Sequence, residues 1–129
     1  MRFPRSRRIL RRADFRRVRN RGKSVAGRFL VLGYLADPDL VEPMRVGIIT
    51  TRKIGGAVVR NRVRRRLRGI LQRTGDRVIP GHWLVFVARS SAASATTAQL
   101  EKEWKWMLRK ASLLRSEPAR TESPESPPS

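Results

Sequence analysis

The apolar positions of the chain follow two different periods, and this predicts a mixture of strands and helices. Residues 25–35 are apolar and β-prone, residues 45–51 form a second such pattern, and residues 83–88 are a continuous apolar run. Runs of this length bounded by turn residues predict strands. The turn sequence Ala-Asp-Pro-Asp at residues 36–39 separates the first two strands, so we expect these two to pair as antiparallel neighbours.

Residues 57–73 show the helical period and contain no acidic residue. At about 100° per residue, one face of this helix is apolar. That face consists of Val59, Val63, Leu67, Ile70 and Leu71. The other face consists of Asn61, Arg62, Arg64, Arg65 and Arg68. The pattern predicts an amphipathic helix whose outer side is cationic.

Two further helices are expected. One covers residues 12–21 and ends at Gly22, because glycine is typical of the position after a helix. The other begins near Thr96, because Gln99 follows at the spacing of a capping box. Its apolar residues recur at helical intervals and should face a sheet. They are Leu100, Trp104, Met107, Leu108, Ala111 and Leu114.

The order of these elements favours an α+β fold in which helices pack on a sheet. The chain has 129 residues, a length that suits one domain. We place this domain at residues 1–115, with a basic arm at residues 1–8. Residues 116–129 are dominated by Pro, Glu, Ser and Thr and contain no large apolar residue, so we expect a disordered tail.

Charge is the extreme feature of the composition, with 30 Lys and Arg residues against 10 Asp and Glu and a formal net charge of +20. Residues 1–23 contribute +10 and residues 52–68 contribute +8, so two segments hold +18 of this charge. Exposed helices ordinarily combine acids with bases at i,i+4, and the helix at residues 57–73 does not. Two acid-poor cationic segments indicate a polyanionic partner, and guanidinium groups are suited to nucleic-acid phosphates.

The sequence disfavours several classes of function. It contains no cysteine, which excludes disulfides and thiolate metal sites and fits a reducing cytoplasm. No apolar stretch approaches the roughly 20 residues of a membrane span, and no apolar segment typical of an export signal follows the basic N-terminus. A nuclease needs a carboxylate cluster or a histidine pair, and neither is evident. We therefore expect no catalytic and no metal-binding residue.

Some weaker features have two interpretations. Phe15 lies in a basic segment, where it could either stack on a base or anchor the first helix on the sheet. Gly55 and Gly56 precede the cationic helix, whose first N–H groups could hold a phosphate, but their spacing is not that of a nucleotide-binding loop and also fits a plain turn. Asp37 and Asp39 look like turn residues.

Residues 52–68 closely resemble the signature of the bacterial ribonuclease P protein family. The match consists of a basic pair, an Ile-Gly, an Ala-Val and an Arg-Asn-Arg triplet followed by spaced basic residues. Upstream, the similarity includes Phe15, Val18 and Gly22, and downstream it includes a strand and a helix. It extends over about residues 7–115.

The resemblance implies a helix, three strands, a helix, a strand and a helix, in a two-layer sandwich with a mixed sheet of about four strands. It also implies a left-handed crossover through the basic helix, against the usual right-handed rule. In the family, a catalytic RNA cuts the 5′ leader from precursor tRNA and uses Mg²⁺, and the protein binds both RNAs without a catalytic residue or a cofactor of its own. The implied RNA-binding residues are Arg52, Lys53, Arg60, Asn61, Arg62, Arg64, Arg65 and Arg68.

The resemblance also implies a cleft for the leader between the sheet and the first helix. A second aromatic residue often follows Phe15 by four positions, but Arg19 stands there, so we expect a more electrostatic contact with the leader. The aromatic residue of the first long strand falls at Gly33 or Tyr34, and we favour Tyr34. The expected cleft residues are Phe15, Arg19 and Tyr34.

The main alternative is a ribosomal or RNA-chaperone protein, which would be equally basic but would have no dedicated substrate. A cationic protein of the membrane surface is disfavoured, because the neighbouring strands offer a core to the apolar face of the basic helix. We therefore expect two partners, the catalytic RNA and precursor tRNA, and no membrane.

Overall fold

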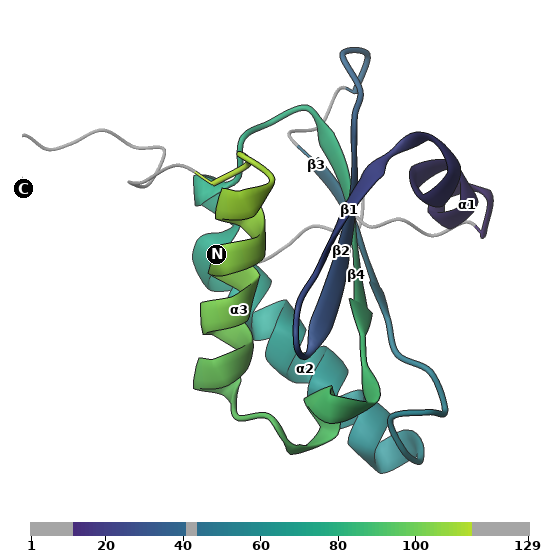
Figure 1. Cartoon of the computed structure of the whole chain (residues 1–129), viewed down its shortest axis with the longest axis vertical. Coiled ribbons are helices and arrows are strands. Elements are labelled where there is room, and N and C mark those ends of the chain that lie inside the picture. Colours follow the sequence, from purple (N-terminus) through teal and green to yellow (C-terminus); the bar gives the residue numbers. More distant parts are fainter. Residues whose placement is uncertain (1–11, 41–43, 115–129) are drawn as a thin grey trace, which may run out of the picture.

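The computed structural model describes residues 12–40 and 44–114, without the side chain of Arg12. These residues form an α+β fold with three α-helices and one four-stranded sheet (Figure 1). In chain order the elements are α1 (Arg12–Arg21), β1 (Lys23–Ala26), β2 (Leu30–Ala36), β3 (Met44–Ile49), α2 (Ala57–Thr74), β4 (His82–Ala88) and α3 (Thr97–Lys110), with short 3₁₀ helices η2 (Gly75–Arg77) and η3 (Ser90–Ser94). The predicted arm and tail lie outside the described residues.

The four strands lie in the order β1-β2-β4-β3. β4 pairs antiparallel with β2 and parallel with β3, so the predicted pairing of residues 25–35 with residues 45–51 is wrong. The continuously apolar β4 lies between them, because a central strand can bury both of its faces. A parallel pair requires a crossover, and α2 supplies it between β3 and β4. The left-handed sense of this crossover stays a prediction.

Residues 25–35 belong to two strands rather than one. β1 and β2 form an antiparallel hairpin, and the chain reverses where α3 contacts it. The carboxylate of Glu103 accepts hydrogen bonds from the backbone N–H groups of Arg28, Phe29 and Leu30, each at 2.7 Å. These N–H groups therefore bond to a side chain of α3 at the turn.

The main core lies between the sheet and the pair of helices α2 and α3 (Figure 1). Phe86 of β4 stacks on Trp104 of α3, with ring centroids 3.7 Å apart and ring planes at 7°. The fully or almost fully buried apolar residues of the two helices are Val63, Leu67, Ile70, Leu71, Leu100, Trp104, Met107 and Leu108. Both helices bury most of the apolar positions that their periodicity predicts. Val59, Ala111 and Leu114 are only partly buried, and the last two follow the end of α3.

The short helix α1 lies on the opposite face of the sheet (Figure 1). Val18 of α1 packs with Trp83 and Val85 of β4 in a second, smaller apolar cluster. Because α1 has only ten residues, it leaves part of this face uncovered. The molecule thus has a thick layer of two helices on one side of the sheet and a partial layer on the other.

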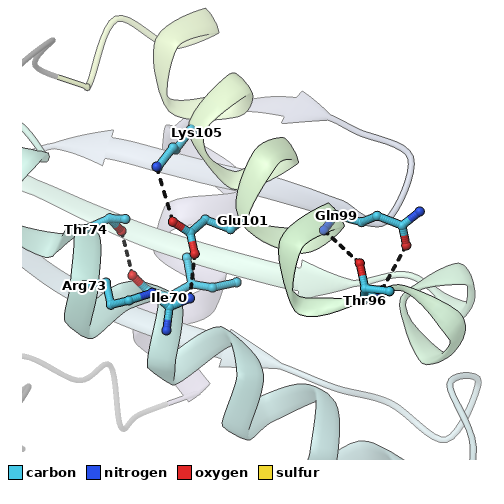
Figure 2. Close-up of polar contacts among 7 residues, drawn as sticks. All are labelled: Ile70, Arg73, Thr74, Thr96, Gln99, Glu101 and Lys105. Carbon is cyan, nitrogen blue, oxygen red and sulfur yellow. Dashed lines mark hydrogen bonds and ion pairs between the residues drawn. The ribbon is translucent and has the colours of Figure 1, made fainter.

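Two predicted helix ends are confirmed. The Thr96 hydroxyl accepts the N–H of Gln99, and the side chain of Gln99 accepts the N–H of Thr96, which completes the capping box at the start of α3 (Figure 2). Gly22 follows α1, and its N–H donates to the Val18 carbonyl at 2.8 Å. A Cβ at Gly22 would collide with the carbonyl oxygen of Tyr34, so glycine allows α1 to come close to β2.

Candidate nucleic-acid interface

The loop between β3 and α2 presents the basic pair of the signature. Ile54 is buried, and its N–H donates to the Thr51 carbonyl at 3.1 Å. Gly55 has a φ of 150°, a value that residues with a Cβ atom rarely adopt. The buried Ile54 anchors the loop, while Arg52 and Lys53 are exposed.

The outward side of α2 is cationic, as the sequence predicts. Asn61, Arg65 and Arg68 are exposed, and Arg60, Arg62 and Arg64 are half-buried. The first turn of α2 contains no acid, and its N-cap is Gly56 without a side-chain cap. We call the set Arg52, Lys53, Arg60, Asn61, Arg62, Arg64, Arg65 and Arg68 the α2 cationic face.

Arg64 is held in place by neutral oxygen atoms. Its guanidinium donates to the Thr50 hydroxyl at 2.5 Å and to the Asn61 side-chain oxygen at 3.3 Å. These bonds join the end of β3 to the first turns of α2. Because neither acceptor is charged, the positive charge of Arg64 remains available to an external phosphate.

Arg62 and Arg66 lie on the side of α2 that faces η3. Arg62 donates to the Ala93 carbonyl at 3.1 Å, and Arg66 donates to the Ala95 carbonyl at 2.7 Å. Both side chains are half-buried. Arg62 therefore attaches α2 to the segment after β4, a structural role that its place in the sequence signature does not reveal.

A groove runs between α1 and the uncovered part of the sheet, and we call it the α1 groove. Its volume is about 830 Å³. Alternate residues of three strands contribute an apolar floor, and α1 and β1 contribute three cationic side chains. The lining residues are Phe15, Arg16, Val18, Arg19, Gly22, Lys23, Ser24, Val31, Gly33, Ile49, Val85 and Val87.

Phe15 and Arg19 line the α1 groove, as predicted, but the placement of Tyr34 is wrong. Tyr34 packs against the main core on the other face of the sheet, and Gly33 lines the groove instead. Successive residues of a strand point to opposite faces, so an error of one position moves a side chain across the sheet. The floor residues Val31 and Val87 were not among the predicted cleft residues. Their signal was the continuous apolar run, which exceeds what one buried face needs.

Asp37 contacts both α1 and the sheet. One of its carboxylate oxygens accepts the indole N–H of Trp83 at 2.8 Å, and the other accepts the N–H of Asp39 at 3.0 Å. The guanidinium of Arg17 lies 3.6 Å from the same carboxylate and 5.2 Å from the centre of the Trp83 ring. The indole N–H and the Asp39 N–H, together with Arg17, hold the pKa of Asp37 below its ordinary value. Asp37 and Asp39 thus form the predicted turn. Asp37 also makes a long-range contact with Trp83.

The described residues contain no group of three or more His, Cys, Asp or Glu side chains that could hold a metal ion. His82 has its Nδ1 atom 3.1 Å from the carbonyl oxygens of Ile79 and Pro80. Within residues 12–40 and 44–114, no helix is long and apolar enough to cross a membrane.

The chain is thus a small, strongly basic α+β domain with a cationic helix on one side of its sheet and an open groove on the other. A family model described as Ribonuclease P matches residues 3–112. The chain belongs to the ribonuclease P protein family. Its role is that of the protein component of a ribonucleoprotein endoribonuclease that acts in tRNA 5′ processing.

Similar proteins agree with this assignment. The ribonuclease P protein component of Beutenbergia cavernae is 41% identical over 101 residues, which cover 78% of this chain and 84% of the relative. The component of Dehalococcoides mccartyi is 39% identical over 118 residues, or 92% and 95% of the two chains. The solved structure of the Staphylococcus aureus protein has a TM-score of 0.77 at 28% identity and covers 84% of this chain and 98% of that one. The resemblance, the α+β fold and the role as the protein component of ribonuclease P are confirmed.

Proposed function

We propose that the α2 cationic face binds the catalytic RNA of ribonuclease P and that the α1 groove holds the 5′ leader of precursor tRNA. The observation that carries this proposal is the chemistry of the α2 contacts. Arg64 bonds to neutral oxygen atoms, and the exposed Arg65 has no partner among the described residues. Their charges are therefore left for RNA phosphates, which release counterions when cations of the protein bind.

The α1 groove suits a single strand rather than a duplex. Its apolar floor and Phe15 can contact the faces of bases, while Arg16, Arg19 and Lys23 along its lining can contact phosphates. Grooves that combine aromatic and cationic side chains are typical of proteins that bind single-stranded nucleic acids. The 5′ leader is a single strand that does not pair with the body of the tRNA. This supports the leader as the occupant of the α1 groove.

We assign catalysis and Mg²⁺ to the RNA subunit, and no cofactor to the chain. This assignment is supported by the use of three described acids in structural contacts: Asp37 bonds to Trp83, Glu101 pairs with Arg73, and Glu103 accepts backbone N–H groups. The absence of cysteine fits a cytoplasmic location.

The experiment that tests the function is precursor tRNA cleavage by a bacterial ribonuclease P RNA at low magnesium, with and without this protein. We expect the protein to stimulate cleavage and to bind precursor tRNA together with the RNA. A protein that binds RNAs indiscriminately and gives no stimulation at any concentration would instead match a ribosomal or RNA-chaperone role.

Arg65→Ala tests the α2 cationic face. Arg65 is exposed and has no hydrogen-bond or ion-pair partner among the described residues. We expect weaker binding to the catalytic RNA and a salt slope, the change of log affinity with log salt, that is smaller by about one unit. Titration at several salt concentrations measures it. Arg65→Lys should retain the slope, and Gln72→Ala, an exposed uncharged position of the same helix, should change neither quantity. An unchanged slope in Arg65→Ala would show that this side chain contacts no phosphate.

A further inference from the structure

The outer side of α3 carries a stripe of four exposed residues outside both surfaces described above. They are Lys102, Trp106, Arg109 and Lys110. Residues three and four positions apart lie on the same side of a helix, so Trp106 has Lys102 one turn before it and Arg109 and Lys110 one turn after it. We call these residues the α3 outer stripe.

Trp106 is not needed for the core. It is 43% exposed, whereas Trp104, two residues earlier, is fully buried against Phe86, and Trp83 is 7% exposed. A large aromatic side chain at the surface loses the free energy that burial would give. The other two tryptophans therefore have a structural explanation in this fold, and Trp106 does not.

The cations of the stripe are not neutralised by the acids of the same helix. Glu101 pairs with Arg73 of α2 and with Lys105, at 2.5 and 3.2 Å (Figure 2). Glu103 is occupied by the N–H groups of the β1–β2 turn. Within the part of the chain that the structure describes, the stripe cations have no ion-pair or hydrogen-bond partner. An exposed indole among unpaired cations is complementary to a nucleic-acid base and its phosphates.

We propose that the α3 outer stripe is a second RNA-binding surface, in which an unpaired base of the catalytic RNA stacks on Trp106 and neighbouring phosphates contact Lys102, Arg109 and Lys110. The inference rests on the proposed function, because it takes RNA as the partner. α2 and α3 lie side by side on the same face of the sheet (Figure 1), and the Arg73–Glu101 ion pair joins them. One RNA molecule can therefore reach both the stripe and the α2 cationic face.

Tryptophan fluorescence of the full chain tests the stacking directly. Trp83 and Trp104 are buried, so quenching by added ribonuclease P RNA should come from Trp106 and should be lost in Trp106→Phe. In titrations with the same RNA, Trp106→Ala should lower the affinity roughly 5- to 100-fold, the range expected for one base–aromatic stack. Trp106→Phe keeps an aromatic ring and should lose less than about threefold. Ile79→Ala, an exposed apolar position outside the stripe, is the matched control and should bind as the unmodified protein does.

The salt dependence tests the cations. Lys102→Ala and Arg109→Ala should each reduce the salt slope of RNA binding by about one unit. If Trp106→Ala binds the RNA with unchanged affinity while Arg65→Ala binds it more weakly, the α3 outer stripe is not an RNA-binding surface. The proposed function would then still stand. If neither variant affects RNA binding, the proposed function fails as well.

Two other outcomes would also overturn the stripe as an RNA surface. Quenching or a blue shift of Trp106 by vesicles of phosphatidylserine and phosphatidylcholine, without any effect of RNA, would assign it to a lipid surface. A dimer in light scattering that Trp106→Ala abolishes, with RNA affinity unchanged, would assign it to a second copy of the chain.

Discussion

The carboxylate of Glu103 stabilises a chain reversal 75 residues away in sequence. It accepts three consecutive backbone N–H groups, two of which are partly buried. A hydrogen bond to a charged group contributes more to stability than a neutral one does, and buried N–H groups without an acceptor are costly. A single side chain of α3 thus fixes where β1 ends and β2 begins.

Removing this carboxylate should destabilise the fold. We expect Glu103→Ala to lower the free energy of unfolding by about 2 kcal/mol, because the N–H groups of the turn lose their acceptor. Urea denaturation followed by circular dichroism measures the change. Glu103→Gln keeps one acceptor oxygen and should lose less. Lys102→Ala, an exposed neighbour, should stay within about 0.5 kcal/mol of the unmodified protein. Equal stability of all four proteins would contradict the role of Glu103.

Asp37 is a second single carboxylate that stabilises the fold, through its bond to Trp83. Its pKa is lowered, chiefly by the Trp83 indole N–H and then by the Asp39 N–H. The lowered pKa means that the folded protein binds a proton less readily than the unfolded chain does. The stabilisation by Asp37 is therefore fully present above the ordinary pKa of 3.8 and is lost as the pH falls through the lowered value.

Asp37→Asn should consequently be less stable than the unmodified protein at about pH 6, and the difference should shrink toward about pH 2.5. Urea unfolding at a series of pH values measures both proteins. Asp39→Asn is the matched control, because it leaves in place the backbone N–H through which residue 39 takes part in the turn. A difference that is constant over the whole pH range would mean that the Asp37 charge contributes nothing.

At the scale of elements, the lengths of the helices decide which surfaces are open. α2 and α3 have 18 and 14 residues and bury one face of the sheet, so their outer sides are left for other contacts. α1 has ten residues and covers only part of the opposite face. The α1 groove exists because the sheet is apolar on both faces while only one face has full helical cover.

Phe15→Ala tests the occupant of this groove. We expect it to reduce the preference for precursor tRNA over mature tRNA roughly fivefold or more, because a base loses its aromatic contact, while binding to the catalytic RNA alone stays unchanged. Competition binding with the two tRNAs measures the preference. Tyr34→Phe changes an aromatic residue on the other face of the sheet and serves as the control. An unchanged preference in Phe15→Ala would favour a purely structural role for Phe15.

At the scale of the whole molecule, one charge excess acts on folding and on binding with opposite signs. With a formal net charge of +20, the Lys and Arg side chains repel one another in the folded state. Salt screens this repulsion, because the Debye length falls from about 30 Å at 0.01 M to about 8 Å at 0.15 M. Salt also competes with RNA for the same cations, so it weakens the complex.

We therefore expect sodium chloride to raise the free energy of unfolding of the protein alone and to lower its affinity for RNA. If six to ten phosphates are contacted, the affinity should fall about 10³- to 10⁵-fold between roughly 50 and 200 mM salt. Urea unfolding and RNA titration over the same salt series measure the two trends. A neutral osmolyte at equal osmolarity controls for solvent effects other than screening. A stability that falls with added sodium chloride would refute the repulsion argument.

Features that depend on near neighbours could be predicted from the amino-acid pattern. The period of residues 57–73 and the absence of acids there fixed α2 and its two faces, and the Thr96–Gln99 spacing fixed the start of α3. Most of the family signature, residues 52–68, lies in this same segment. These features need only a few residues of context, because a helix satisfies its backbone internally and divides its side chains between faces by a fixed angle.

Contacts between distant segments of the chain depend on the complete fold and could not be predicted in the same way. It placed β4 between β2 and β3, divided residues 25–35 into a hairpin at Glu103, and set Gly33 rather than Tyr34 in the groove. Strand pairing and register depend on partners far along the chain, and a shift of one residue exchanges the faces of a sheet. Local patterns carry no information on that choice, so the groove and the contacts of Arg62 became visible only in the folded molecule.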